Sequence, residues 1–286
     1  MQGVVVADFG RHYEVELADG SILPSRPRGR RSQIACGDRV ALALAADSQG
    51  VIERVKPRRS LLYRSDGRRQ KLIAANASQA VIVVAAEPSF SDELVSRCLV
   101  AAEQQGMRAL IVLNKIDLED KLEAARARLA PFRDLGYAVV ELCALEGAAA
   151  LRPALAGQCS VLVGQSGMGK SSLINALLPA AGATVREISM RLDSGKHTTT
   201  HSRLYQLGDG VSLIDSPGLQ SFGLAHLSRA EIEQAFREFQ PHLGGCRFRD
   251  CRHDREPDCA VRDAVAAGGI AARRLEHFHA LCAAVK

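Results

Sequence analysis

The sequence predicts a three-part protein whose centre is an α/β domain with a parallel sheet. Short alternating strands separated by turn signals occupy residues 1–68, apolar strands alternate with helical segments over 69–225, and a cysteine-rich segment precedes a final helix in 226–286. At 286 residues, the chain has room for these parts, because a typical domain has roughly 100–200 residues. We therefore expect a small β-barrel, a parallel α/β domain and a helical metal-binding module.

Composition narrows the class of protein. The chain has no run of about 18 apolar residues, and its first residues lack the basic and apolar regions of a secretory signal. These features predict a cytoplasmic protein without membrane contacts. Three of the eight cysteines crowd with a histidine between Cys246 and Cys259, while the others are scattered among apolar neighbours. This distribution favours metal binding over disulfides.

The first module reads as β-structure. Strands are expected at residues 3–7, 13–17, 39–44 and 51–55, with turn signals such as Asp19-Gly20 and Gly37-Asp38 between them. A closed barrel of about five strands suits the OB-fold, a common oligonucleotide binder. Aromatic residues are scarce before residue 72, so contacts with the backbone or shape of folded RNA are favoured over stacking on single strands.

Positive charge is concentrated in the same module. Residues 1–71 contain 14 Lys/Arg and 8 Asp/Glu, a net of +6, so the remainder of the chain nets −1 and the total is +5. One basic cluster is expected in a loop around Arg26, Arg28, Arg30 and Arg31, and a second follows at residues 56–71. Such clusters are typical either of a polyanion-binding surface or of a solvated face.

The central part alternates strands and helices. Strands are expected at residues 80–85, 109–113, 138–142 and 159–163. Ser91 offers an N-cap to a helix that Gly106 can end, and a second helix is expected over 121–135. This alternation predicts a parallel sheet with crossover helices.

A phosphate-binding loop follows the strand at 159–163. Residues 164–171 match G-x-x-x-x-G-K-[ST] and precede a helix, which is the required context. In such loops the backbone N–H groups surround the phosphates, Lys170 reaches the β- and γ-phosphates, and the Ser171 hydroxyl binds Mg²⁺. The predicted contacts are Gly164, Gln165, Ser166, Gly167, Met168, Gly169, Lys170, Ser171 and Ser172.

A guanine-reading tetrapeptide, Asn114-Lys115-Ile116-Asp117, lies at the carboxyl end of the strand at 109–113. The Asp117 carboxylate would accept hydrogen bonds from guanine N1–H and its exocyclic amine, which adenine cannot offer in that arrangement. Lys115 would lie against the base, and Asn114 would tie the loops together. Tight ATP binding would instead indicate an ATPase.

The order of these two motifs is unusual. The guanine motif precedes the phosphate loop, whereas ordinary GTPases carry them in the opposite order. The central domain is therefore predicted to be a circularly permuted P-loop GTPase domain. A permutation moves the ends of the domain, so the flanking modules can be coupled to its switch loops.

A third motif completes the predicted nucleotide site. Residues 215–218 fit D-x-P-G, in which Asp215 holds Mg²⁺ and the Gly218 N–H senses the γ-phosphate. Residues 203–207 and 211–214 should form the hairpin before it. The polar segment 195–200 suits a mobile switch, and one of its threonines should complete the Mg²⁺ shell. Thr199 is our choice, with Thr198 and Thr200 as alternatives.

The attacking water needs a group to orient it. Leu219 stands where many GTPases have a glutamine, and leucine cannot hydrogen-bond to water. His197 in the switch segment is the candidate, since a neutral imidazole can accept a hydrogen bond from water, and Gln220 is the alternative. The catalytic set is thus His197, Lys170 and Thr199, and slow intrinsic turnover that needs an activator is expected.

A metal site is predicted near the C-terminus. Cys246, Cys251, His253 and Cys259 supply three thiolates and one imidazole, a complete tetrahedral shell for one Zn²⁺. No position remains for a catalytic water, so the zinc should be structural. The closing helix carries apolar residues on one face and basic residues elsewhere.

Together these motifs resemble the bacterial small-ribosomal-subunit-dependent GTPases, the RsgA/YjeQ family, over essentially the whole chain. The resemblance implies an OB-fold, a permuted GTPase domain and a zinc domain, with Mg²⁺ and GTP or GDP as cofactors. It also implies GTP hydrolysis stimulated by the small ribosomal subunit, late subunit maturation and contacts with ribosomal RNA. One departure is Cys143-Ala144 where GTPases usually show Ser-Ala; since the contact there is mainly a backbone N–H to the guanine oxygen, cysteine should be tolerated.

Two functions remain open at the level of the sequence. In the first, the protein is a GTPase switch whose outer modules grip ribosomal RNA. In the second, it is an RNA-binding assembly factor with a structural, slowly hydrolysed GTP. The missing glutamine favours the second, whereas the complete set of Lys170, Ser171, Asp215 and the switch threonines favours the first. A monomer is expected in either case.

Overall fold

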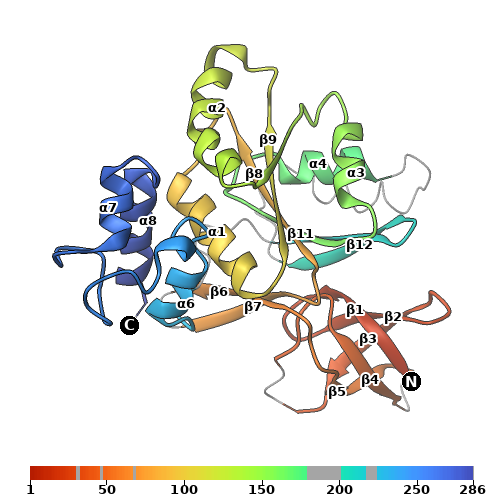
Figure 1. Cartoon of the computed structure of the whole chain (residues 1–286). Helices are drawn as coiled ribbons and strands as arrows, with labels where there is room; N and C mark the ends of the chain where they lie inside the picture. Colours follow the sequence, from red (N-terminus) through yellow and green to blue (C-terminus); the bar gives the residue numbers. More distant parts are fainter. Residues whose placement is uncertain (30–32, 46–47, 67–68, 179–200, 217–223, 286) are drawn as a thin grey trace.

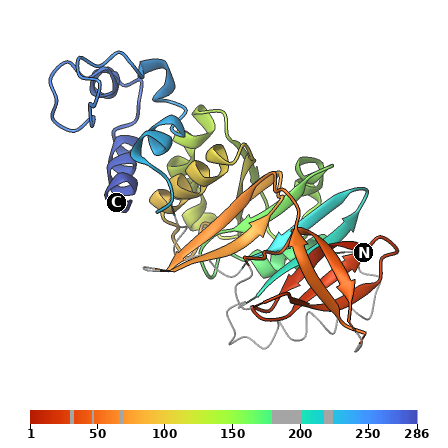
Figure 2. The ribbon, with the colours of Figure 1, turned by 90° about the horizontal axis from the view of Figure 1, so that it is seen from below.

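The computed structural model describes residues 1–286 apart from 30–32, 46–47, 67–68, 179–200, 217–223 and 286. A β-barrel and a C-terminal helical module lie at opposite ends of a central α/β domain (Figures 1 and 2). Within the described ranges, no helix has the length and apolar character needed to cross a bilayer.

The barrel has the strand order of an OB-fold, β1-β2-β3-β5-β4, and a β1–β4 pairing closes it. Its strands are β1 (Gln2–Asp8), β2 (Tyr13–Leu17), β3 (Ile22–Pro27), β4 (Arg39–Leu44) and β5 (Gly50–Val55). Alternate residues point inward and form a separate core that includes Val5, Val15, Val40 and Ile52. Arg26, expected in a loop, lies in β3, a strand whose two prolines weaken its signal in the sequence.

A hairpin links the barrel to the central domain. Strands β6 (Leu61–Asp66) and β7 (Arg69–Ala75) pair with each other and form a separate sheet. The backbone N–H of Leu61 donates to Gln105 Oε1 at 2.9 Å, so the hairpin also contacts the central domain. The boundary predicted between residues 68 and 69 lies between these two paired strands, whereas the last strand of the barrel, β5, ends at Val55.

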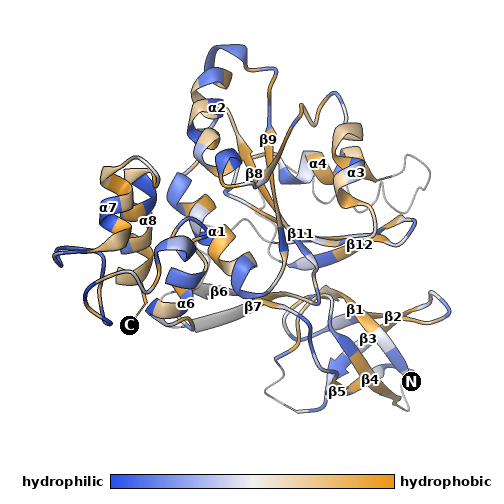
Figure 3. Cartoon of the chain, in the orientation of Figure 1, coloured by the Kyte–Doolittle hydropathy of each residue, from blue (hydrophilic) through white to orange (hydrophobic). Residues whose placement is uncertain are grey.

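The central sheet is parallel from β10 through β13 in the order β10-β9-β8-β11-β13, and antiparallel β12 completes it. The strands are β8 (Gln79–Ala85), β9 (Arg108–Asn114), β10 (Ala138–Glu141), β11 (Cys159–Val163), β12 (Ser202–Gly208) and β13 (Val211–Asp215). The helices are α1 (Asp92–Gln104), α2 (Glu119–Asp134), η1 (Ala149–Leu151), α3 (Arg152–Leu155) and α4 (Lys170–Leu177). Strand β8 is buried throughout, as its continuous apolar run predicts (Figure 3).

One strand pairing joins the barrel and the central domain into a single 11-stranded sheet. Ala7 and Asp8 of β1 pair with Arg203 and Ser202 of β12, and Arg203 pairs in turn with Asp215 of β13. The Arg203 guanidinium also lies 3.0 Å from the Glu14 carboxylate of the barrel. Two successive strand pairings therefore connect the barrel to Asp215, the predicted Mg²⁺ ligand.

The C-terminal module contains α6 (Arg229–Gln234), η2 (Gln240–His242), α7 (Ala260–Ala266) and α8 (Ala272–Ala283). Ser228 and Glu231 form a capping box at the start of α6. Three fully buried phenylalanines, Phe236, Phe239 and Phe278, pack around one another with ring centroids 5.0–5.6 Å apart. The module packs through α8 against α1 of the central domain (Figure 1).

Gly37 lies where the barrel meets the hairpin, and we expect its substitution by alanine to destabilise the protein. Its φ is +90°, and a Cβ there would lie 2.1 Å from the Ala75 carbonyl oxygen. Gly20 is the matched control, because its φ is +82° but a Cβ would meet nothing within 4 Å. Gly20→Ala should lower the free energy of unfolding by about 1–2 kcal/mol through backbone strain alone. Gly37→Ala should lower it by about 1–3 kcal/mol more, because of the added clash. Urea unfolding followed by circular dichroism checks this; equal losses would contradict it.

Candidate nucleotide site and metal centre

The loop between β11 and α4 has the geometry of a phosphate-binding loop. Gly164 has φ +147°, and a Cβ there would lie 2.3 Å from the Val83 carbonyl oxygen of the neighbouring strand β8. Gly167 and Gly169 have φ values of +83° and +87°. These conformations require glycine, and they bring the loop directly onto the N-terminus of α4, where unpaired N–H groups and the helix dipole favour an anion.

Lys170 and Asp215 lie together at the base of this loop. Lys170 Nζ donates to the carbonyl oxygens of Gly164 and Gln165, each at 2.8 Å, and the residue is buried. Burial lowers the pKa of Lys170, and the nearby Asp215 charge opposes this effect. Burial likewise raises the pKa of Asp215 to about 7, against the opposing effects of Lys170 and the Ser216 N–H. Electrostatic interactions with a phosphate or a divalent cation are strong in such a dry environment.

The Asn114 side chain joins three loops. Its Nδ2 donates to the Met168 carbonyl oxygen in the phosphate loop at 2.9 Å, and its Oδ1 accepts from the Ala144 N–H at 2.9 Å. A Cβ at Gly169 would lie 2.2 Å from Asn114 Nδ2, so only glycine permits this approach. The guanine motif, the phosphate loop and the Cys143-Ala144 loop are thereby held side by side, although they are far apart in the sequence.

The last residue of the guanine motif, Asp117, lines an open hollow. Lys115 has φ +61°, and its Nζ donates to the Glu87 carbonyl oxygen at 2.9 Å. Asp117 is exposed and lines the hollow together with Glu87 and Lys121, whose charged groups lie 2.7 Å apart. Glu87 was not predicted from the sequence; its proximity to the motif depends on the packing of β8 beside β9, and no local signal indicates it.

The other predicted residues differ in exposure, and some fall outside the described part of the chain. Ser171 is exposed in the first turn of α4, Ile116 and Ser172 are half-buried, and Cys143 is buried. His197, Thr199 and Gly218 lie outside the described residues, as do the alternatives Thr198, Thr200 and Gln220. The roles assigned to them remain predictions.

The four predicted metal ligands converge. The ligand atoms of Cys246, Cys251, His253 and Cys259 all lie within 4.8 Å of one another. His253 Nδ1 lies 3.2 Å from Cys259 Sγ and 3.6 Å from Cys246 Sγ, and the two sulfurs are 3.9 Å apart. Bonds of about 2.0–2.3 Å from a central Zn²⁺ to nitrogen and sulfur give ligand separations of this size in a tetrahedron. The cluster is therefore compatible with one zinc ion.

A carboxylate that the sequence analysis missed supports this cluster. Glu233 Oε1, on α6, contacts Nε2 of His253, which leaves Nδ1 facing the three sulfurs. Metal-binding histidines commonly donate their second N–H to such a carboxylate, which sets the tautomer and the orientation of the ring. Glu233 precedes the cysteines in the sequence by a turn and a 3₁₀ segment, so its role depends on how the module folds.

Comparisons with known proteins find relatives of a single family. The family model described as RsgA GTPase matches residues 55–225. The small ribosomal subunit biogenesis GTPase RsgA of Ralstonia pickettii is 56% identical over 280 residues, covering 95% of this chain and 89% of that protein. The protein of the same name from Nitrosospira multiformis is 51% identical and covers 100% of this chain and 91% of its own length.

Two solved structures share the fold. YjeQ from Thermotoga maritima is 30% identical, with a TM-score of 0.75 over 99% of this chain and 97% of its own. YloQ, described as a circularly permuted GTPase, is 28% identical, with a TM-score of 0.69 over 99% of this chain and 93% of its own. The permuted order inferred from the motifs is thus the order of a solved fold.

We expect Glu233→Ala to weaken zinc binding by about 10- to 100-fold, because His253 would lose the carboxylate that orients it. Glu276→Ala is the control, since Glu276 is an exposed residue of α8 in the same module. Competition against a chromophoric zinc chelator measures the affinity. Equal zinc affinities in the two variants would refute a supporting role for Glu233.

Proposed function

The chain belongs to the RsgA GTPase family, and we propose that it is a GTP-hydrolysing switch whose turnover is gated by the small ribosomal subunit during its maturation. The relatives are named for small ribosomal subunit biogenesis. The observation that carries the proposal is the Asn114 bridge, which assembles the guanine motif and the phosphate loop into one site.

Each part of the site has a proposed role in binding and hydrolysis. Lys170 and the N–H groups of the phosphate loop bind the β- and γ-phosphates, and Asp117 reads the guanine edge. Mg²⁺ is held by Ser171, Asp215 and Thr199. His197 orients the attacking water, because leucine follows the D-x-P-G motif. The ionised form of Asp215 is favoured once a divalent cation lies beside it.

The outer modules are proposed to contact ribosomal RNA and to hold one structural zinc. The barrel contributes the basic surface, since residues 1–71 contain 14 Lys/Arg against 8 Asp/Glu. The C-terminal module, from residue 226, is proposed to fold around Zn²⁺ at Cys246, Cys251, His253 and Cys259. The central domain takes the hairpin β6–β7 in addition to residues 76–225. We propose a cytoplasmic monomer.

A switch is favoured over a scaffold with a structural nucleotide. In the sheet, Ala7 of the barrel, Arg203 and Asp215 occupy neighbouring positions on three adjacent strands. A shift of the barrel on RNA would therefore reach the Mg²⁺ ligand through two backbone pairings. A merely structural nucleotide would not require this connection.

The turnover of GTP by the pure protein tests the gating. We expect slow intrinsic hydrolysis and stimulation of at least roughly 10-fold by small ribosomal subunits, since activators of related switches supply missing transition-state contacts. Large subunits are the control. A rate unchanged by small subunits would favour the assembly factor with a structural GTP.

We expect Asp117→Asn to weaken GDP binding by roughly 100-fold or more, because the amide cannot accept both hydrogen bonds from the guanine edge. Asp120→Asn is the matched control, since Asp120 lines the same hollow outside the motif. Titration with a fluorescent GDP, with ATP as competitor, measures both affinity and discrimination. Tight ATP binding by the unaltered protein would contradict guanine specificity.

A further inference from the structure

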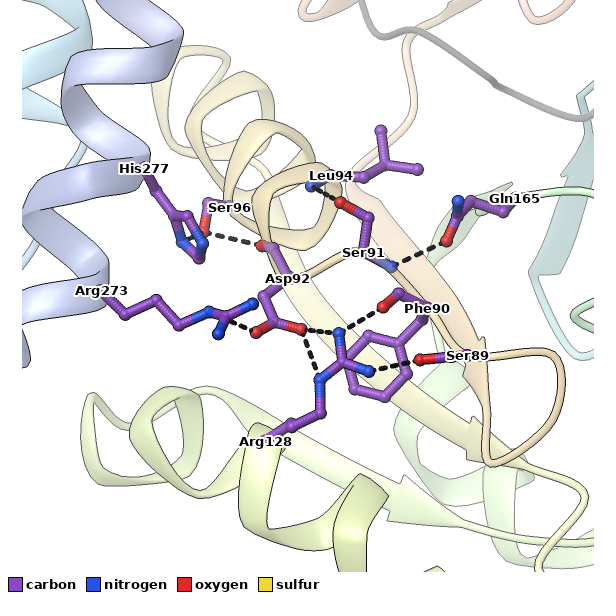
Figure 4. A network of polar contacts seen from close by, with 10 residues as sticks. All are labelled: Ser89, Phe90, Ser91, Asp92, Leu94, Ser96, Arg128, Gln165, Arg273 and His277. Carbon is purple, nitrogen blue, oxygen red and sulfur yellow. Dashed lines mark hydrogen bonds and ion pairs between the residues drawn. The ribbon is translucent and has the colours of Figure 1, made fainter. Parts of the chain in front are cut away.

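The segment between β8 and α1 contacts both nucleotide-binding loops. Lys115 of the guanine motif donates through Nζ to the Glu87 carbonyl oxygen at 2.9 Å. The side chain of Gln165, the second residue of the phosphate loop, accepts from the Ser91 N–H at 2.9 Å (Figure 4). A Cβ at Gly167 would lie 3.3 Å from the Pro88 ring. The position of residues 87–91 therefore affects the position of both loops.

Asp92, the next residue, is held from two directions. Its carboxylate is buried, with 4% of the side chain exposed. Arg128 of α2 donates through Nε to Asp92 Oδ1 at 2.8 Å, while Arg273 of α8 lies 2.7 Å from Asp92 Oδ2 (Figure 4). One oxygen is thus engaged by the central domain and the other by the C-terminal module.

Arg128 extends this contact back along the segment. Besides Asp92, it donates to Ser89 Oγ at 2.6 Å and to the Phe90 carbonyl oxygen, and its guanidinium lies 4.3 Å from the centre of the Phe90 ring. Arg128 therefore binds the same stretch of chain whose Ser91 N–H contacts the phosphate loop. A change in the contacts of Asp92 would therefore alter the position of this stretch of chain.

A second set of contacts keeps α8 in register with α1. Ser96 Oγ lies 2.9 Å from His277 Nδ1 and accepts from Arg274 at 2.5 Å. Arg274 in turn pairs with Glu238 at 2.5 Å, and both side chains are 4% exposed. This buried docking contact holds Arg273 near Asp92 without depending on Arg273 itself.

We propose that Asp92 is a positioning residue through which the C-terminal module stabilises the nucleotide-bound arrangement of the phosphate and guanine loops. The inference rests on the proposed function as a nucleotide-binding switch. When Arg273 holds Asp92, the segment 87–91 is ordered against both loops and nucleotide release is slowed. A partner that displaces α8 removes this contact and speeds release.

Thermodynamic linkage makes the effect reciprocal. If contact between α8 and Asp92 strengthens nucleotide binding, nucleotide binding must strengthen the docking of α8 by the same factor. A contact that only holds the fold together would show no such dependence on nucleotide. This reciprocity separates a positioning role from a structural one.

Arg273→Ala tests the proposal with little risk to folding. The Arg273 side chain is 65% exposed, and Asp92 keeps its pairing with Arg128 when Arg273 is removed. Arg255→Ala is the charge-matched control, because that side chain is 93% exposed and pairs only with Asp254 among the contacts that the structure describes. Arg273→Lys should restore part of the effect, since an ammonium can reach the same carboxylate.

Two measurements are made on the full-length, zinc-loaded protein. The first is the dissociation rate of a fluorescent GDP, which we expect to rise about 3- to 10-fold in Arg273→Ala and to stay unchanged in Arg255→Ala. The second is hydrogen exchange in α8, which GDP should slow in the unaltered protein and in Arg255→Ala but not in Arg273→Ala. Asp92→Asn combined with Arg273→Ala should be non-additive in the release rate.

The outcomes separate this inference from the proposed function. Unchanged GDP release in Arg273→Ala, together with α8 exchange that ignores GDP in the unaltered protein, would overturn the positioning role while nucleotide binding itself stands. An unaltered protein that fails to bind GDP would overturn the proposed function and this inference together.

Discussion

The buried amide of Asn114 is the contact on which the nucleotide site depends. It is 2% exposed, and its oxygen and nitrogen are both satisfied by backbone groups of other loops. Removing it would leave the Met168 carbonyl and the Ala144 N–H without this partner, each at roughly 1–3 kcal/mol if no water replaces it. Only glycine at position 169 allows the amide to approach so closely. The Asn114 amide therefore both belongs to the guanine motif and holds the three loops of the site together.

The permutation explains where the outer modules attach. In the sheet, β8, β9 and β11 are neighbours regardless of their order in the chain, so the nucleotide site forms as it does in an ordinary GTPase. The two ends of the permuted domain, however, lie at other positions than the ends of an ordinary GTPase domain. The barrel joins the sheet beside β12, which leads to Asp215, whereas the C-terminal module packs on α1, which begins beside the phosphate loop. Each outer module thus packs against an element that leads to a different part of the same site.

Local patterns predicted most of the central domain, because continuous apolar runs and glycines with required conformations are properties of short segments. Strand β3 was missed since its prolines mask the strand signal, and the hairpin β6–β7 was missed because its many charged residues obscure alternation. The cysteine and histidine residues that could hold zinc were visible as a cluster within fourteen residues of sequence, but Glu233 was not. The contacts of Asp92 could not be foreseen either, since Ser96 and His277 of the same network are 181 residues apart.

The buried charges where α8 packs on α1 determine geometry more than stability. Arg274 of α8 pairs with Glu238 of its own module and donates to Ser96 of α1. Burying Arg274 and Glu238 removes both from water, and their attraction only roughly offsets that loss, so an apolar contact of similar volume would stabilise the packing equally well. Unlike an apolar contact, the hydrogen bond from Arg274 to Ser96 permits one register between the two helices. The ion pair of the exposed Arg273 adds little to the stability of the fold, because solvent screening and lost side-chain entropy offset most of the attraction in surface ion pairs. Arg273 instead provides the second ion-pair partner of the Asp92 carboxylate. Because this contact is weak, a partner can break it without unfolding either module.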